Sequence, residues 1–428
     1  MFRQQRAGDT SSFENDIPMN GFHLKLLVLT LFFIATNQAE QFLSGLNSYN
    51  SPGVKFPIAL SSPPKIGPLH FRKYPVASES FESVGVFDVN NDQQLDIVSG
   101  AFWYEGPGYL HRYYIGQPSR FGQYYNDFST IPMDVNGDGW TDFITGGWED
   151  SVIYWRKNPG NNKDLWKNIV IGKTGNVETI RGWDVDRDGT IEIISNNPGK
   201  PLKIFRLILN SQKKGTGEFK GYEVWNRQGH GLGFGDLNKD GRGDLILDNG
   251  WLESPLHPFE QKWIFHADFT LQSASIPIIV TDINADGKND FIAGKAHDYG
   301  LNWYEQKGEA SGNRSWQKHP IDPLHSQFHT MEWEDLDNDS IPELITGKRY
   351  RAHNDEDPGS HDPVGLYYYQ WNGESFSKQV ISYGQFGEGK GTGIYFQVVD
   401  LQKDGRKDIV VAGKDGLCIF YNEGYQQK

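Results

Sequence analysis

One acidic nine-residue loop occurs seven times in the chain, beginning at Asp88, Asp134, Asp184, Asp236, Asp282, Asp335 and Asp400. Each copy places oxygen-bearing side chains at its first, third, fifth and ninth positions and lies between two apolar runs. Successive copies begin 46, 50, 52, 46, 53 and 65 residues apart. A repeat of about 50 residues with strand-like segments is typical of propeller blades that have four strands each. The repeats therefore predict an all-β fold, a seven-bladed β-propeller.

The spacing of the loop oxygens suits a hard cation, because Ca²⁺ accepts about six to eight oxygen ligands. An EF-hand closes with a glutamate at its twelfth position, whereas these loops close at the ninth, so they are not EF-hands. The predicted calcium ligands are Asp88, Asn90, Asp92, Asp96, Asp134, Asn136, Asp138, Asp142, Asp184, Asp186, Asp188, Glu192, Asp236, Asn238, Asp240, Asp244, Asp282, Asn284, Asp286, Asp290, Asp335, Asp337, Asp339, Glu343, Asp400, Asp404 and Asp408. The alternative is that these side chains cap turn amides without a metal. Sevenfold copying favours a structural role, since a catalytic site is normally single.

The net charge of −14 argues against a nucleic-acid partner. The charge belongs largely to the loops, because their four ligand positions hold 23 of the 55 acidic residues. Seven bound Ca²⁺ ions would bring the charge to −14 + 14, about zero. The acidic composition therefore says little about the partner. The single cysteine, Cys418, excludes a disulfide within the chain.

Each repeat contains an apolar run before the loop, a β-rich run after it, an aromatic run and a fourth run. The last repeat stops after its third run, and an isolated run of the fourth type, residues 70–76, precedes the first repeat. We predict that this segment forms the outer strand of the seventh blade. Closing the ring in this way removes exposed sheet edges. The predicted propeller spans residues 68–428.

The N-terminal region contains an apolar run of ten residues, Leu26–Ala35, after several basic residues. A bilayer span needs about 20 apolar residues, so the run predicts a signal peptide over residues 1–39, with Met19 as an alternative start. An uncleaved anchor is the alternative. Residues 40–67 read as a linker. We expect a secreted, periplasmic or cell-surface protein with no transmembrane span in its mature form.

The loops resemble the FG-GAP or VCBS repeats of calcium-binding β-propellers over about residues 69–424. A narrower resemblance is to the propeller domain of aldos-2-ulose dehydratase/isomerase. It rests on residues 229–233, 297–305, 347–354 and 362–367, and it does not extend to the cupin-like domains of that enzyme. This resemblance implies an exported lyase that acts on a sugar-derived ketone.

The functional face should lie opposite the acidic loops, where the first strand of each blade begins and the second ends. The residues six positions before each loop are Glu82, Phe128, Glu178, His230, Ile276, His329 and Ile394. Four of these seven are Glu or His, and a closed ring would gather them at the mouth of the central channel. Imidazoles and carboxylates together suit Zn²⁺ or another divalent transition metal. We therefore predict His230 and His329 as ligands, helped by Glu178 or Glu82; a solvated polar edge is the alternative.

The connections after the second strands add further candidates. We predict His297 as the base, with Lys348 and Arg349 steadying an oxyanion or substrate hydroxyls. A long insert, Arg349–Pro363, accounts for the 65-residue interval and predicts a lid or substrate clamp, with a plain surface loop as the alternative.

The predicted function is a metal-dependent lyase or dehydratase acting on a keto- or anhydro-sugar, with a carbohydrate-derived small molecule or glycan as partner. The alternative is a non-catalytic, calcium-stabilised propeller that binds glycans or a protein. A polysaccharide lyase is a third possibility, although an acidic polymer requires a longer basic groove.

Overall fold

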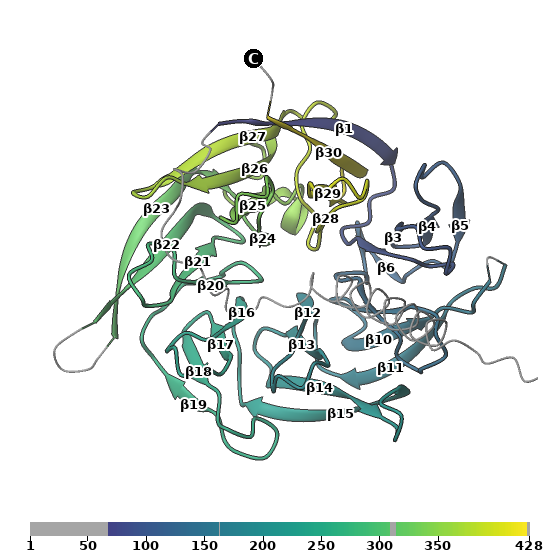
Figure 1. Cartoon of the computed structure of the whole chain (residues 1–428), viewed down its shortest axis with the longest axis horizontal. Coiled ribbons are helices and arrows are strands. Elements are labelled where there is room, and N and C mark those ends of the chain that lie inside the picture. The colour runs from purple at the N-terminus through teal and green to yellow at the C-terminus, as the bar shows by residue number, and fades with distance from the viewer. Residues whose placement is uncertain (1–66, 162, 309–313, 426–428) are drawn as a thin grey trace, which may run out of the picture. The chain divides into compact units, whose positions relative to one another are not determined.

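The computed structural model describes residues 67–161, 163–308 and 314–425. Within them, seven four-stranded antiparallel sheets form a ring, and their innermost strands lie toward the centre of that ring (Figure 1). The predicted seven-bladed β-propeller is confirmed. The predicted signal peptide and nearly all of the predicted linker lie outside the described residues.

The blades follow one another in chain order, each running from its innermost to its outermost strand. Blades one to three are β2 (Gly85–Phe87), β3 (Asp96–Ser99), β4 (Phe102–Tyr104) and β5 (Arg112–Tyr114); β8 (Ile131–Met133), β9 (Asp142–Gly146), β10 (Val152–Lys157) and β11 (Lys167–Lys173); and β12 (Thr179–Trp183), β13 (Glu192–Asn196), β14 (Leu202–Leu209) and β15 (Gly215–Trp225). Blades four to six are β16 (Leu232–Gly235), β17 (Asp244–Leu247), β18 (Gly250–Glu253) and β19 (Ile264–His266); β20 (Ile279–Thr281), β21 (Asp290–Gly294), β22 (Tyr299–Gly308) and β23 (Arg314–Ser326); and β24 (Met331–Glu334), β25 (Glu343–Gly347), β26 (Val364–Trp371) and β27 (Phe376–Gly384).

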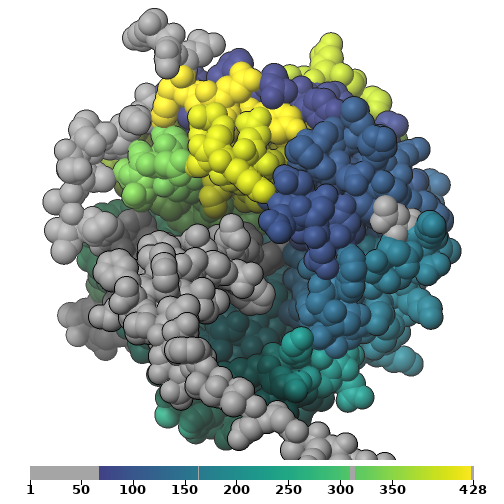
Figure 2. Space-filling view, turned by 45° about the vertical axis from the view of Figure 1, so that its right-hand side comes forward, coloured from purple at the N-terminus to yellow at the C-terminus, as the bar shows by residue number. Residues whose placement is uncertain are grey.

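Blade seven joins the two ends of the described chain. It contains β28 (Gln397–Val399), β29 (Asp408–Val411), β30 (Leu417–Tyr425) and, on the outside, β1 (Leu69–Ala77). Strands β1 and β30 are antiparallel, with Leu69 opposite Tyr425. The purple and yellow segments meet at this seam in the space-filling view (Figure 2). The predicted closure by an N-terminal strand is thus confirmed.

The core lies between neighbouring blades. Every residue of the second strand is buried in all seven sheets, for example in β9 and β25. Each of these strands begins with the ninth-position Asp or Glu of its acidic loop and continues with at least two apolar residues, because each sheet packs against another sheet on both of its faces. Burying one large aliphatic side chain contributes about 1.5–3 kcal/mol, so the seven interfaces together hold the ring.

Two smaller elements lie outside the blades, and both are near the end of the ring where β12, β16 and β24 begin. One is a hairpin of β6 (Arg120–Phe121) and β7 (Tyr124–Tyr125) between blades one and two. The other is η1 (Ala352–Asp355), a 3₁₀ turn inside the blade-six insert. Among the described residues, no helix has the length and hydropathy that crossing a bilayer requires.

Candidate metal centre

Four side chains meet where the inner strands of blades three, four and six begin. Glu178 precedes β12, His230 precedes β16 and His329 precedes β24, while His297 lies between β21 and β22. One ligand atom from each of the four lies within 4.8 Å of the others. We call these four residues the histidine cluster. Three of them share the register predicted from the sequence, and the fourth comes from a connection.

The contacts within the histidine cluster centre on one carboxylate oxygen. The distance from Glu178 Oε1 to His329 Nε2 is 2.9 Å, and the distance to His230 Nε2 is 3.4 Å. His297 completes the group, with its Nε2 atom 3.0 Å from His230 Nε2. Three imidazole nitrogens and one carboxylate oxygen are the donor types that Zn²⁺ and related ions prefer.

The outer nitrogens of two rings fix their tautomers. His230 Nδ1 lies 2.9 Å from the carbonyl oxygen of Ala274, and His297 Nδ1 lies 3.1 Å from Asp357 Oδ2. Both partners are acceptors, which favours a hydrogen on each Nδ1 and directs Nε2 of each ring into the cluster. The two Nε2 atoms are 3.0 Å apart, which is hydrogen-bond distance, and the tautomers decide which ring donates.

The protonation states are those that metal binding requires. Burial lowers the pKa of His329 to about 3 and also depresses the pKa of His297. Burial alone would raise the pKa of Glu178, but hydrogen bonds from His230 and His329 hold that pKa well below its ordinary value. At neutral pH His297 and His329 are therefore neutral and Glu178 is ionised. The buried Nδ1 of His329 has no hydrogen-bond partner among the described residues.

The blade-six insert adds a second layer of contacts. Asp357 accepts from His297 through Oδ2, and its Oδ1 lies 3.0 Å from Nδ1 of His353. The rings of His353 and His297 stack, with centroids 4.1 Å apart and planes at 18°. The sequence analysis placed His353 and Asp357 only within the range of the insert and gave neither residue a role. Their four-residue spacing was the available signal, but it acquires meaning only when the insert folds over the channel.

Glu82, a predicted metal ligand, lies outside the group of ligand atoms. Its carboxylate contacts Arg349 Nε at 2.9 Å and Lys414 Nζ at 3.1 Å. Burial would raise the pKa of Glu82, but these two cations outweigh it and hold the pKa at about 2. The structure thus places Glu82 in an ion pair. The same Arg349 reaches the histidine cluster, with Nη1 3.5 Å from Glu178 Oε1.

Lys348, a predicted catalytic residue, is directed into the insert. Its ammonium donates to the carbonyl oxygens of Gly359, of Ser360 at 3.1 Å and of Asp362 at 2.7 Å. Burial lowers the pKa of Lys348 to about 8. These hydrogen bonds hold the returning arm of the insert, the part that leads into β26, so the structure gives Lys348 a structural role.

A charged layer crosses the channel one step further inside. Arg181, on β12, donates to Glu332 Oε1 at 2.9 Å and to the carbonyl oxygen of Ile276 at 2.8 Å. Its guanidinium also lies over the ring of Tyr395, 4.6 Å from the centroid. These contacts link blade three to blades five, six and seven. Arg181 lies three residues after Glu178, on the strand that Glu178 precedes, so these contacts lie deeper in the ring than the histidine cluster.

At the opposite end of the strands, the acidic loops are tied by their own amides. The ninth-position Asp142 accepts from the amides of Val135 at 3.1 Å and Asn158 at 2.8 Å. The first-position Asp134 accepts from the amides of the fifth and sixth positions at 3.1 and 3.0 Å. The ninth carboxylate thus joins the loop to the third strand. This is the amide-capping arrangement that the sequence left open beside calcium binding.

Two of the seven loops also bring acidic ligand atoms together. Asp184, Asp186 and Glu192 do so in blade three, and the first, third and fifth positions, Asp335 to Asp339, do so in blade six. In blade three Arg206 contacts Asp186 at 2.9 Å and Glu192 at 3.4 Å, so a guanidinium occupies part of that space. Burial raises the pKa of Glu192 to about 8, which shows the cost of ionising it without a further cation.

We expect Asp142→Asn to lower the free energy of unfolding by about 1–3 kcal/mol, because the new NH₂ group would face a backbone donor in a fully buried position. Thermal or denaturant unfolding measures the change. Asp164→Asn, at an exposed position in the same blade, is the matched control and should be nearly neutral. Equal stability of the two variants would contradict the assigned role.

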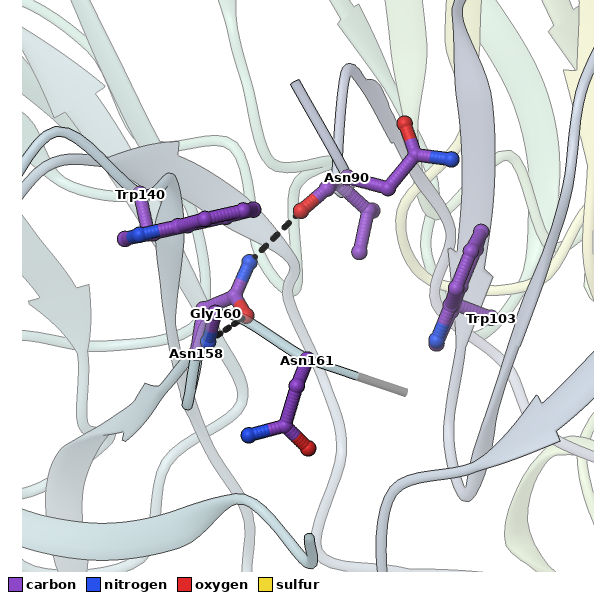
Figure 3. Close-up of a pocket in the computed structure, with 7 residues that line it drawn as sticks. Asn90, Trp103, Trp140, Asn158, Gly160 and Asn161 are labelled. Atoms are coloured by element: carbon purple, nitrogen blue, oxygen red, sulfur yellow. Dashed lines mark hydrogen bonds between the residues drawn. The ribbon is translucent and has the colours of Figure 1, made fainter. Parts of the chain in front are cut away.

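A small pocket lies between the loops of blades one and two (Figure 3). It is lined by Val89, Asn90, Trp103, Trp140, Asn158, Gly160 and Asn161. The Asn158 side chain crosses it and donates to the carbonyl oxygen of Val89 at 2.8 Å. Its volume is about 60 Å³, whereas ligand sites usually have about 300–1,000 Å³. The pocket belongs to the loop end of the blades and is remote from the imidazoles.

The fold and the repeats define the class of protein. Residues 134–195 and 282–346 match the family model described as an FG-GAP-like repeat. The chain is therefore a seven-bladed β-propeller that contains FG-GAP-like repeats. No curated protein matches the chain.

Solved structures similar to this chain include three of low sequence identity. The crystal structure of BBS1N in complex with ARL6DN has 13% identity and a TM-score of 0.44, covering 82% of this chain and 96% of that one. The Saccharomyces cerevisiae protein Sqt1 has 12% identity and a TM-score of 0.44, covering 82% and 97%. The V. cholerae biofilm matrix protein Bap1 has 15% identity and a TM-score of 0.33, covering 74% of this chain and 41% of that one. None of these likenesses bears on what this chain binds.

Proposed function

We propose that the histidine cluster binds one divalent transition metal and that the channel mouth dehydrates a carbohydrate-derived ketone. The observation that carries the metal is the convergence of one nitrogen from each of three histidines and one oxygen of Glu178 within 4.8 Å of one another. Hydrogen bonds at Nδ1 hold the rings of His230 and His297 in this arrangement.

A divalent metal at this position supplies polarisation of a substrate carbonyl. The chain's own residues then move the proton. His353 is the best-placed proton acceptor, because its Nδ1 donates a hydrogen bond to Asp357 and leaves Nε2 free. In addition, half of its side chain is exposed. His297, which the sequence predicted as the base, is instead engaged through both nitrogens.

The reaction would proceed in two proton transfers at His353. Its Nε2 atom takes the proton from the carbon next to the substrate carbonyl. The same imidazolium then returns a proton to the β-hydroxyl, which leaves as water while a carbon–carbon double bond forms. Arg349 is buried between Glu82 and Glu178, so its part in this scheme is to hold Glu178 rather than to touch substrate.

Exposed aromatic rings support a carbohydrate as the substrate class. Four of them lie in or beside the connections at the mouth end of the blades: Phe121, Trp148, Tyr299 and Phe386. Aromatic faces suit sugar rings because one side of a sugar ring is largely apolar. The same rings favour the second candidate, a non-catalytic propeller that binds glycans. The resemblance to aldos-2-ulose dehydratase favours the enzyme.

We expect metal analysis after mild chelation to find about one transition metal per chain, retained by the histidine cluster. Calcium, held by the acidic loops, forms the second part of the proposal and should leave first. The metal-loaded protein is then incubated with keto- and anhydro-sugars, and the conjugated ketone is followed by its ultraviolet absorbance. Glycan binding with calcium alone and no turnover would support the binding module instead.

A further inference from the structure

The insert of blade six supplies part of the histidine cluster's surroundings although it lies outside the repeat pattern. Asp357 accepts from Nδ1 of His297, and its other oxygen contacts His353. Its side chain is only 11% exposed. A carboxylate behind a ligating imidazole fixes the tautomer and raises the basicity of the ligand nitrogen. Whether His297 is prepared for a metal therefore depends on the position of the insert.

The tip of the insert rests on the hairpin β6–β7, which comes from the other side of the channel. The amide of Asn354 donates to Tyr124 Oη at 3.0 Å, and Gln123 Nε2 donates to Asn354 Oδ1 at 2.6 Å. These two contacts join blade six to the link between blades one and two. Neither Gln123 nor Tyr124 belongs to the histidine cluster.

The two arms of the insert are fastened separately. Lys348 binds three carbonyl groups of the returning arm, and Tyr299 Oη lies 2.6 Å from Asp362 Oδ2. On the outgoing arm, which follows β25, the carbonyl oxygen of Arg351 accepts a hydrogen bond from Lys414 Nζ at 3.0 Å. The base of the insert is thus held by the blades, whereas its tip contacts the hairpin and His297.

The backbone near the tip is strained. Arg351, His353, Asn354 and Asp355 have φ values of 55°, 46°, 57° and 68°, in the left-handed region that side chains other than glycine rarely adopt. Such strain persists only where surrounding contacts impose it. The closed position of the insert is therefore maintained by its contacts with the hairpin and with His297, and their loss favours opening.

We propose that Asp357 is a positioning residue and that insert closure and metal binding form one coupled equilibrium. In the closed position Asp357 orients His297 and the cluster binds the metal tightly; in the open position His297 loses its partner and the affinity falls. Coupling is reciprocal, so the metal also favours closure. The inference rests on the proposed metal centre but not on the proposed reaction.

The first test measures the dissociation constant of Zn²⁺ by competition with a chromophoric chelator. Asp357→Asn should weaken binding by about 10–100-fold. The double variant Gln123→Ala/Tyr124→Phe, which leaves every ligand in place, should weaken it by about 5-fold or more. His361→Asn replaces another imidazole of the insert, which is exposed, and serves as the matched control with wild-type affinity.

The second test follows opening directly by trypsin cleavage after Arg351. Zn²⁺ should slow cleavage in the wild-type protein, and the Gln123→Ala/Tyr124→Phe variant should be cut faster at equal metal concentration. Wild-type affinity in both test variants, or cleavage that ignores the metal, would overturn the coupling. Failure of the wild-type protein to bind Zn²⁺ would overturn the metal centre as well. Tight, coupled binding without sugar turnover would leave the coupling intact and reject only the proposed reaction.

Discussion

Replacing His353 with glutamine should reduce turnover by about 10²–10⁴-fold while the protein keeps its metal. The reason is that His353 is stacked on His297 and hydrogen-bonded to Asp357, yet it is not one of the four residues of the histidine cluster. Its ligand atom instead forms a second group with those of His297 and Asp357, all within 4.8 Å of one another. Glutamine can occupy similar space but cannot accept a proton at neutral pH. Steady-state rates on the sugar that the wild-type protein converts measure the effect.

Metal content distinguishes this loss from collapse of the site. His353→Gln should retain about one transition metal per chain, whereas His297→Gln should lose both metal and turnover. His361→Gln, on the same insert, should behave as wild type in both measurements. Wild-type turnover in His353→Gln would remove the assigned proton acceptor, and loss of metal in that variant would make His353 part of the metal's support.

Arg349→Met should lower the free energy of unfolding by about 3–5 kcal/mol. The Arg349 side chain is 2% exposed, and it lies between two buried carboxylates, Glu82 and Glu178. Removing the guanidinium leaves Glu82 with Lys414 alone and takes one cation from Glu178. Denaturant unfolding of the metal-free and metal-loaded protein measures the loss.

Two further variants make the cause specific. Adding Glu82→Gln to Arg349→Met removes one uncompensated charge, so the double variant should recover part of the lost stability. Arg351→Met replaces a half-exposed neighbour whose ion pair with Asp355 is at the surface, and it should cost less than about 1 kcal/mol. If Arg349→Met and Arg351→Met have similar stability, the buried ion pairs of Arg349 do not stabilise this end of the ring.

The fold was predictable because its signal is repeated. Seven loops at nearly regular intervals determine the number of blades, and the lone segment at residues 70–76 predicts the closing strand. A single strand of three residues, such as β2, carries too little local preference to be assigned by itself. Its position follows only from its place before an acidic loop.

The site was predictable where it obeys the repeat. Glu178, His230 and His329 share one register of the inner strand, and the ring brings them together. Glu82 shares that register too, but its neighbours Arg349 and Lys414 come from connections of different length. A register predicts the end of the channel at which a side chain lies. It does not predict which charged partner reaches that side chain from a non-repeated segment.

The insert shows the limit most clearly. Its residues have no counterpart in the other blades, so neither Asp357 nor the task of Lys348 follows from spacing. The left-handed conformation of His353 and Asn354 is decided by contacts with the hairpin β6–β7 and with the cluster. Such contacts exist only after the ring has formed, which is why sequence patterns cannot anticipate them.

The pairing of β1 with β30 has a consequence for how the ring assembles. Leu69 and Tyr425 are adjacent in space but lie at opposite ends of the described chain. Blades one to six can each form from contiguous sequence, whereas the last blade needs a segment made first and a segment made last. During synthesis, β1 must therefore wait without a partner until residues 417–425 have left the ribosome. The ring closes in one late, long-range step, and until then β1 presents an open strand edge to any chain nearby.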